Sequence, residues 1–550
     1  MREQRTSASP APCTPAACPD AAVSGPGAPF LLLALAWLAL LPLFVVWLRI
    51  DQLFAPWDHA GHASLVMRLH DGILAGNPWC FYELSKFYPP LFHLLAVPAS
   101  FVSTHPDAFC FGNWLALLAL LWSTFLLGRT LVGPSAGLAA ALLVPAFPYV
   151  TIMGRMPMTD LSVTAAVAWT LALLCDGDPL GTPRAARRLG LAIALGMLAK
   201  WSYVFFAALP ILVAVVRNAR AQRRRAVTTL WRRWGWLALW PAVLAGPWYV
   251  RSLPNLVAQS AWQFGSGVRI AEGDPDPLSM ASLLYYGPVL RTYYVGNLIA
   301  LALLAGGVAI VVAWSGRGRA PIAPPARWTP LLLSLLSGAV CLVLVANKDV
   351  RYPLPLVPSL AVVSAAAIAF VRGRLRAPAL AACALLGWLM AWHSLFRLEP
   401  PDPTDWKVPA VAGSIAAAVR SSTSVAPLRV LVVPNDAHMN FTSLRYALEL
   451  ALRDGPGKPR KVEVDRIEDD LDAARLATYD RAVLVWPPPA ETIVSRGSVA
   501  GARFGLEDSG WTVESRMVRG DGREICVLAP APGPVDRLSG SSAGRSRRSS

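Results

Sequence analysis

Long apolar blocks recur along most of this chain and constrain its fold more than any other feature. They are about 16 to 24 residues long, which is the length that a helix needs to cross the hydrocarbon core of a bilayer. The chain of 550 residues is 55% hydrophobic and only 15% charged, whereas soluble domains are about 25% charged. The sequence therefore predicts a polytopic α-helical membrane protein.

The charge of the segments between the apolar blocks predicts how the chain crosses the membrane. Arginines cluster within 184–188, 217–233, 317–327 and 372–376, and such segments stay on the cytoplasmic side. The alternate segments are mixed in charge and aromatic, so we expect them on the other side, with the N-terminus in the cytoplasm. Together these constraints predict about eleven spans, at 30–50, 108–129, 134–152, 160–175, 189–200, 202–217, 234–250, 291–314, 329–346, 350–371 and 378–396.

Two apolar segments do not fit a simple span. The run 189–217 is too long for one span and is interrupted at Lys200–Tyr203, so we expect two short spans that meet on the outside. Residues 88–103 are also apolar, but a span there would reverse the orientation of everything downstream. We therefore expect a juxtamembrane or re-entrant helix at 88–103, within an extracytoplasmic loop over 51–107. A second such loop is predicted at 251–290.

The ends of the chain differ from the hydrophobic domain at 30–400. Residues 1–29 are rich in Pro, Ala and Ser and predict a disordered cytoplasmic tail, and residues 531–550 predict another disordered tail. Residues 401–530 alternate strand and helix patterns, which predicts an extracytoplasmic soluble α/β domain. Its strands are expected at 428–434, 461–465, 481–487, 511–518 and 523–529, and its helices at 439–454 and 467–477.

Two acids stand beside predicted spans on the outer side. Asp58 lies just beyond the first span, in a loop rich in aromatic residues and histidine, where a general base can reach a substrate at the membrane surface. Asp160 directly precedes the fourth span and shares a short turn with Arg155. A helix cap or an interfacial anion is the alternative for Asp58, and helix capping is a strong alternative for Asp160, so the residues alone leave both roles open.

Several cations and tyrosines fall on the same predicted side and could bind a phosphorylated lipid. Lys200 is the one charge in its apolar run and is expensive in a bilayer without a partner, so we expect it to meet a phosphate near the outer surface. The turn at 347–352 also suits a phosphate. The candidates are Lys86, Arg155, Lys200, Tyr203, Arg251, Arg351 and Tyr352. Snorkelling or contact with lipid headgroups remains the alternative.

A metal site is the weaker interpretation of the histidines beside Asp58. His59 and His62 could complete such a site with Asp58 if the stretch is helical, but no further carboxylate cluster lies in the loop. The eight cysteines show no metal-site spacing. We therefore expect neither a metal nor another cofactor. The net charge of +16 is explained by cytoplasmic arginines and does not require nucleic acid.

The order of these motifs resembles a known family. After the acid Asp58 come YPPLFHLL, an R-M-x-M-x-D turn that ends at Asp160, a lone lysine between two short spans, PWYV and RYPLPLVP. Over about residues 30–400 this order resembles the GT-C membrane glycosyltransferases of the bacterial aminoarabinose (lipid A) transferase and protein O-mannosyltransferase group. The chain departs from the pattern in having His59 where a glutamate is usual, and in placing Lys86 three residues before the Pro-Pro pair.

The resemblance implies an activity and roles for the candidate residues. A sugar would move from a polyprenyl-phosphate carrier to a lipid, glycan or protein acceptor at the outer face of the plasma (inner) membrane, with inversion at the sugar carbon. Asp58 would be the base and Asp160 the second catalytic acid. The carrier phosphate would meet Lys86, Lys200, Arg251, Arg351 and Tyr352. No metal is strictly required.

Two other classes of protein remain as alternatives. A transporter or flippase would also carry charged residues in its spans, but it would place them near the midplane and is often built from repeated halves. Here the charges gather at one predicted face, and the sequence contains no internal repeat. A non-catalytic protein that binds a sugar-lipid would instead use the C-terminal domain as its module.

Overall fold

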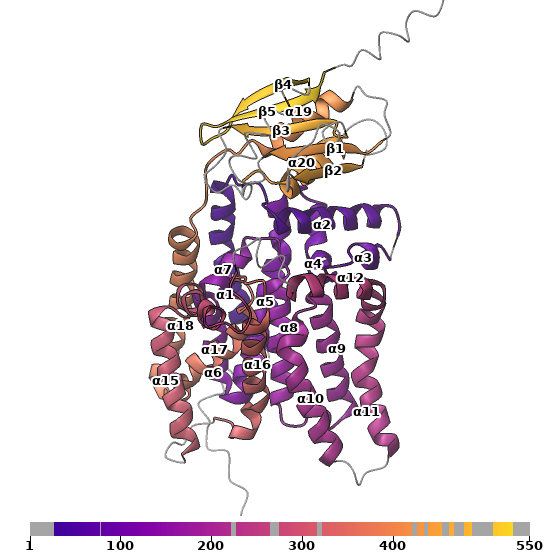
Figure 1. The fold of residues 1–550 in the computed structure, drawn as a ribbon. Helices are drawn as coiled ribbons and strands as arrows, with labels where there is room; N and C mark the ends of the chain where they lie inside the picture. The colour runs from indigo at the N-terminus through magenta and orange to yellow at the C-terminus, as the bar shows by residue number, and fades with distance from the viewer. Residues whose placement is uncertain are drawn as a thin grey trace, which may run out of the picture.

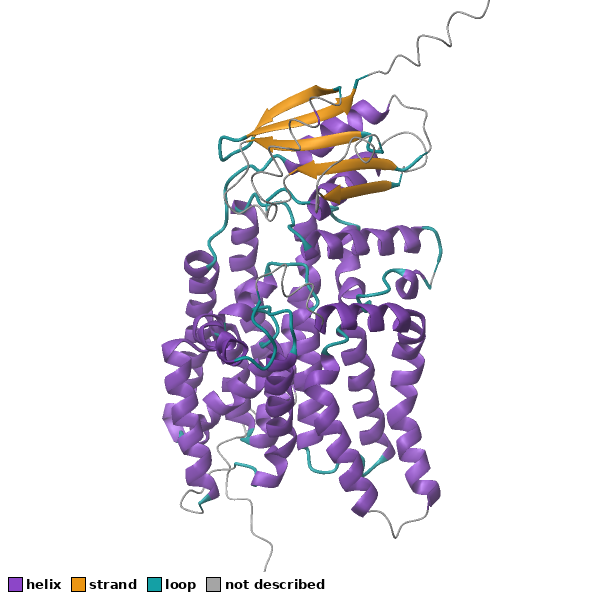
Figure 2. Ribbon diagram, in the orientation of Figure 1, coloured by secondary structure: helices purple, strands orange, loops and turns teal. Residues whose placement is uncertain are grey.

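The structure is a computed structural model in which a small α/β domain lies at one end of a bundle of helices (Figures 1 and 2). We call this end of the bundle the domain end. The structure describes residues 27–77, 79–221, 227–264, 274–315, 322–420, 426–433, 438–453, 461–466, 478–486, 506 and 510–531. The predicted tails lie almost wholly outside these residues, although α1 already begins at Gly27.

The helices of the bundle and of the segments beside it run from α1 to α18. Their bounds are α1 (Gly27–Ile50), α2 (Asp58–Leu74), α3 (Cys80–Glu83), α4 (Leu91–Ser100), α5 (Cys110–Leu131), α6 (Pro134–Leu143), α7 (Pro148–Gly154), α8 (Asp160–Cys175), α9 (Pro183–Ala199), α10 (Tyr203–Ala221), α11 (Val227–Trp240), α12 (Gly246–Phe264), α14 (Met280–Val289), α15 (Gly296–Trp314), α16 (Pro325–Leu344), α17 (Val357–Ala365) and α18 (Arg376–His393).

Six helices among the described residues are long and apolar enough to cross a membrane. The number rises to seven if the bent pair of α6 and α7, with an angle of 68°, is one span. Other predicted spans form shorter helices, so the number of about eleven is not confirmed. The segment at 160–175 shows why a short helix suffices. It forms α8, which is buried along nearly its whole length and so contacts protein in place of lipid.

The two irregular apolar segments form the elements expected of them. Helix α9 ends at Ala199 and α10 begins at Tyr203, so the break in the run 189–217 is confirmed. Gly196 allows the two helices to approach there, because a Cβ atom at this position would lie 2.3 Å from the ring of Tyr203. Residues 88–103 contain α4, whose 10 residues are too few to span a bilayer.

The predicted extracytoplasmic loop at 251–290 contains helical segments. Helix α12 covers its first part, and α14 covers its last part. Prolines at 254 and 288 lie inside these helices. Helix α12 lies beside α3 (Figure 1), and Trp248 Nε1 donates a hydrogen bond of 3.0 Å to the carbonyl of Ser85.

The C-terminal domain contains the predicted strands in the order β2-β1-β3-β5-β4. The strands are β1 (Leu428–Val433), β2 (Val462–Arg466), β3 (Arg481–Trp486), β4 (Trp511–Val518) and β5 (Glu524–Pro530). Strand β1 is parallel to β2 and β3, while β5 is antiparallel to β3 and β4. The predicted helix at 439–454 forms α20 (Phe441–Arg453), and the one at 467–477 lies outside the described residues.

One helix of this domain is absent from the predictions. Helix α19 (Val408–Arg420) lies in a stretch with Pro409 and Gly413, which resembles a linker. Its buried positions nevertheless repeat at helical spacing, so the sequence pattern did indicate a helix here. These positions are Val408, Val411, Ala412, Ile415, Ala416 and Val419.

A single hydrophobic cluster joins the C-terminal domain to the predicted loop at 51–107. It contains Val66 of α2 and Phe92 of α4 together with Leu444 of α20 and Val527 of β5. Figure 1 shows α2 lying across the bundle directly beneath the domain. Because a shared apolar core fixes the relative position of its parts, the domain is packed onto α2 and does not hang from a linker.

Close helix contacts in the bundle generate a stability prediction. A Cβ atom at Gly137 would lie 2.5 Å from the backbone nitrogen of Arg129, whereas a Cβ at Gly307 meets nothing within 4 Å. We expect Gly137→Ala to destabilise the protein by about 1–3 kcal/mol. Gly307→Ala should be neutral or slightly stabilising. Thermal unfolding in detergent measures both, and equal melting temperatures for the two variants would contradict the packing of α5 on α6.

Candidate functional site

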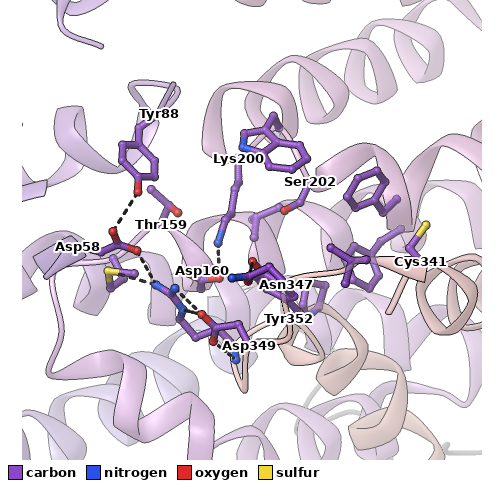
Figure 3. Close-up of a pocket in the computed structure, with 18 of the residues that line it drawn as sticks. Asp58, Tyr88, Thr159, Asp160, Lys200, Ser202, Cys341, Asn347, Asp349 and Tyr352 are labelled. Carbon is purple, nitrogen blue, oxygen red and sulfur yellow. Dashed lines mark hydrogen bonds and ion pairs between the residues drawn. The ribbon is translucent and has the colours of Figure 1, made fainter. Parts of the chain in front are cut away.

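A cavity of about 380 Å³ lies among α2, the start of α8, the α9–α10 break, α16 and the turn before α17 (Figure 3). One part of its wall is polar, and another part is apolar. The polar part comprises Asp58, His62, Tyr88, Thr159, Asp160, Lys200, Ser202, Asn347, Asp349, Arg351 and Tyr352. The apolar part comprises Phe87, Met158, Val163, Trp201, Phe205, Phe206, Cys341, Leu342, Val345 and Pro355.

Asp58 is the first residue of α2 and faces two polar partners. The hydroxyl of Tyr88 donates to its Oδ1 at 3.3 Å, and the guanidinium of Arg351 donates to its Oδ2 at 3.3 Å. The side chain of Asp58 is 46% exposed. The carboxylate is therefore oriented by two donors and still open to a ligand, as a general base must be.

Arg351 is held in turn by Asp349, two residues before it. Its Nε and one terminal nitrogen donate to Asp349 Oδ2 at 2.8 and 2.5 Å, and its backbone N–H donates to Oδ1 at 2.8 Å. Charge-assisted contacts of this kind fix the plane of a guanidinium. Arg351 thus connects a carboxylate of its own turn to Asp58, which lies far away in the sequence.

Asp160 and Lys200 form a buried ion pair across the cavity wall. Lys200 Nζ lies 2.7 Å from Asp160 Oδ1, and the two side chains are 13% and 4% exposed. Lys200 thus has a protein partner in Asp160, and its expected contact with a phosphate stays a prediction. The second oxygen of Asp160, Oδ2, and the hydroxyl of Thr159 are buried and have no hydrogen-bond partner among the described residues. These two oxygen atoms of the cavity wall are therefore available for hydrogen bonds to a ligand.

Tyr352 lies beside this pair. The ammonium of Lys200 is 5.9 Å from the centre of its ring, within cation–π range. Its hydroxyl donates to Asn347 Oδ1 at 2.8 Å. The cavity wall therefore carries the carboxylates of Asp58, Asp160 and Asp349 and the cations Lys200 and Arg351, and each of these two cations already contacts a carboxylate. An anionic ligand has to share or replace these contacts.

His62, one of the two histidines near Asp58, lies against His93 of α4. His62 Nδ1 lies 3.0 Å from His93 Nε2, and both side chains are fully buried. Burial lowers the pKa of His59 and of His93 to about 3. In the described part of the chain, no group of three or more His, Cys, Asp or Glu side chains is placed to hold a metal ion.

Four of the candidate residues do not line the cavity. Arg155 stacks 4.0 Å above Trp47 and pairs with Glu399 at 3.3 Å, because it caps the end of α7 that faces α1. The Tyr203 hydroxyl is buried and lies 2.7 Å from the Thr170 hydroxyl. Arg251 donates to the carbonyl of Tyr82 at 2.7 Å. Lys86 is exposed and precedes the cavity residues Phe87 and Tyr88.

The cavity also contains polar residues that sequence reasoning did not select. Tyr88 belongs to the YPP motif, Thr159 precedes Asp160, and Asn347 and Asp349 share the turn of Arg351. The pattern of an acid and an arginine two residues apart in one turn could have identified Asp349 as a candidate residue. The sequence carried no corresponding signal for the contact between Tyr88 and Asp58.

Comparison with known proteins identifies the fold of this chain. No protein-family model and no curated protein matches the sequence. The solved structure of ArnT from Cupriavidus metallidurans, bound to undecaprenyl phosphate, is similar with a TM-score of 0.56 and 15% identity, over 91% of this chain and 98% of that one. This chain has the GT-C fold. The fold expected from the order of the motifs is therefore confirmed.

A second membrane glycosyltransferase shares this fold. The arabinofuranosyltransferase AftD from Mycobacteria matches with a TM-score of 0.54 and 17% identity, over 91% of this chain and 40% of that larger chain. At 15% and 17% identity, the similarity to these proteins establishes the fold of the backbone and not the roles of side chains. The roles of Asp58, Asp160, Lys200 and Arg351 therefore have to be argued from the geometry of this cavity.

The ion pair in the cavity wall generates a prediction. Lys200→Met leaves the Asp160 carboxylate buried and unpaired, and we expect a loss of about 3–5 kcal/mol in the free energy of unfolding. Adding Asp160→Asn to this variant should restore most of the loss, because no buried charge remains. Thermal unfolding of both single variants and the double variant measures the coupling. Additive effects would show that the two side chains do not interact.

Two histidines with a lowered pKa, His59 and His93, predict a pH dependence of stability. The unfolded chain binds protons on His59 and His93 below a pKa of about 6.5, whereas in the folded protein each pKa is about 3. Stability is therefore fully present above pH 6.5 and is lost as pH falls towards 3, by about 1.4 kcal/mol per pH unit for each histidine. We expect the melting temperature of His93→Gln to fall less steeply over this range than that of the wild type.

An exposed histidine provides the control for this measurement. His393→Gln, at the end of α18, should keep the wild-type pH dependence. A slope that is identical in the wild type and in His93→Gln would show that His93 titrates normally in the folded protein.

Proposed function

We propose that this protein is a glycosyltransferase that moves a sugar from a polyprenyl-phosphate carrier to an acceptor at the extracytoplasmic face of the plasma (inner) membrane. The observation that carries the proposal is the two-part cavity, in which the half-exposed carboxylate of Asp58 lies beside Arg351. The GT-C fold and its occurrence in ArnT, which was solved with bound undecaprenyl phosphate, support this choice of donor.

The two parts of the cavity suit the two parts of such a donor. The prenyl chain is apolar and would lie along Phe205 and Phe206 of α10 and Leu342 and Val345 near the end of α16. The sugar phosphate is polar and would lie between Asp58 and the Asp160–Lys200 pair. The donor thus enters with its tail in the bundle and its reacting bond near the half-exposed carboxylate of Asp58.

The chemistry follows from the charges in the wall. Asp58 accepts the proton of the acceptor hydroxyl, and the acceptor oxygen attacks the anomeric carbon of the sugar from the face opposite the phosphate. The bond between this carbon and the phosphate oxygen breaks, and polyprenyl phosphate leaves with the electron pair. Lys200 and Arg351 stabilise the charge that develops on the leaving phosphate, by sharing contacts now made to Asp160 and Asp349. Asp160 thereby modulates the positive charge that Lys200 presents to the leaving phosphate.

The arrangement of α9 supports the extracytoplasmic placement of the reaction. The helix starts at Pro183, next to Arg184, Arg187 and Arg188, and ends at Ala199 beside the cavity. Its 17 residues are about 25 Å long, so the arginines and the cavity lie near opposite faces of a bilayer. With the arginines in the cytoplasm, the cavity faces outwards, together with the C-terminal domain.

Transfer by the purified protein in liposomes tests the proposal. With a panel of polyprenyl-phosphate-linked sugars and acceptors extracted from cell envelopes, we expect sugar transfer and release of polyprenyl phosphate. Asp58→Asn should lower kcat by about 10²–10⁴-fold, because general base catalysis is lost. Asp71→Asn, at an exposed position of the same helix, should keep the wild-type rate.

Two results would overturn this assignment. Transfer at the wild-type rate by Asp58→Asn would remove Asp58 from the reaction. Movement of the intact donor across sealed liposomes in the absence of an acceptor, without transfer, would instead identify a flippase.

A further inference from the structure

The residue that precedes Asp58 has a strained backbone. Trp57 has φ 45° and ψ −120°, and the N–H of His59 donates to the carbonyl of Pro56 at 3.0 Å. This is the geometry of a type II′ turn with Trp57 at its second position, which is usually occupied by glycine. A non-glycine residue keeps such a conformation only where its surroundings enforce it.

Helix α2 does little to stabilise its own start. Trp57 is the N-cap residue and makes no side-chain hydrogen bond to the first turn, whereas Ser, Thr, Asp or Asn usually supply one. The hydrogen bond from His59 closes the turn, and the Gly61 N–H donates to the Trp57 carbonyl at 3.2 Å. The conformation that presents Asp58 therefore depends on contacts from outside α2.

The first turn of α20 in the C-terminal domain makes those contacts. The Ser443 hydroxyl is buried and lies 3.0 Å from the carbonyl of Ala55 and 2.9 Å from Asn440 Oδ1, so its single proton is shared between these two acceptors. The ring of Phe441 packs edge-on against Trp57, with 6.4 Å between ring centres. These contacts hold the residues on the N-terminal side of Asp58, while Arg351 and Tyr88 hold its carboxylate.

We propose that the start of α20 is a clamp, formed by Phe441 and Ser443, that holds the strained turn at Trp57 and thereby positions Asp58. Under the proposed glycosyltransferase function, on which this role rests, both are positioning residues, because neither lines the cavity. The contacts of Asp58 with Tyr88 and Arg351 are both 3.3 Å long. A small relaxation of the turn breaks them and misaligns the base, and small misplacements of catalytic groups reduce rates strongly.

A second contact between the same two helices provides a matched control. Ser64 Oγ of α2 donates to Glu449 Oε2 of α20 at 2.6 Å. Like Ser443, Ser64 is buried, but it lies further along α2, away from the turn. Ser64→Ala therefore loosens the interface by one serine hydroxyl without releasing the turn.

Hydrogen exchange tests the clamp without any assay of activity. In Ser443→Ala, the amides of His59 and Gly61 should exchange about tenfold faster, as expected when one buried hydrogen bond is lost. Phe441→Leu, which keeps an apolar side chain, should have the same effect. In Ser64→Ala these amides should exchange as in the wild type. Unchanged exchange in the clamp variants, or equal acceleration in Ser64→Ala, overturns the proposal.

Kinetics then test whether the clamp serves the reaction. Ser443→Ala should lower kcat about tenfold and leave KM for the polyprenyl-phosphate donor unchanged, because the cavity wall that binds the donor is intact. In a Trp57→Gly background, where the turn carries no strain, the same substitution should lower kcat less than about twofold. An equal fall of kcat in both backgrounds overturns the positioning role. A wild-type protein without transferase activity overturns the proposed function, while the exchange rates still decide whether the clamp exists.

Discussion

Charged side chains in an apolar bundle need partners, and this constraint shapes the whole cavity. Lys200 interrupts the run between α9 and α10, and its ion pair with Asp160 ties this break to the start of α8. Arg351 ties its own turn to the start of α2 through Asp349 and Asp58. The helix ends that line the cavity are thus connected by pairs of opposite charge, and a phosphate bound there would have to compete with carboxylates that are already in place.

Features that depend on local sequence could be predicted, because hydropathy and strand patterns act over a few residues. The break at Lys200–Tyr203, the short helix at 88–103 and the strands of the C-terminal domain were of this kind. The directions of side chains were harder, because they depend on packing between distant segments. Arg155 and Tyr203 are polar residues at helix ends like Lys200, yet they turn towards Glu399 and Thr170. Only the folded chain distinguishes these cases.

Length was the least reliable guide to the bundle. The predicted span at 160–175 forms α8, which has only 16 residues and is surrounded by protein along nearly its whole length, and a helix without lipid contact has no need to match the bilayer. Prolines do not mark helix ends at these two positions, because Pro254 and Pro288 lie inside helices α12 and α14. In a crowded bundle, neighbouring helices can satisfy the backbone groups that a proline leaves unpaired.

The hydrophobic cluster shared by α2, α4 and the sheet has a consequence for how the protein is made. Asp58 is synthesised early, before most of the membrane helices, but Val527 of β5 belongs to the same cluster as Val66 of α2. The early part of the chain therefore waits for partners that leave the ribosome near the end of translation. A nascent chain that stops before β5 is already inserted in the membrane, yet it lacks the core against which the segment carrying Asp58 is packed.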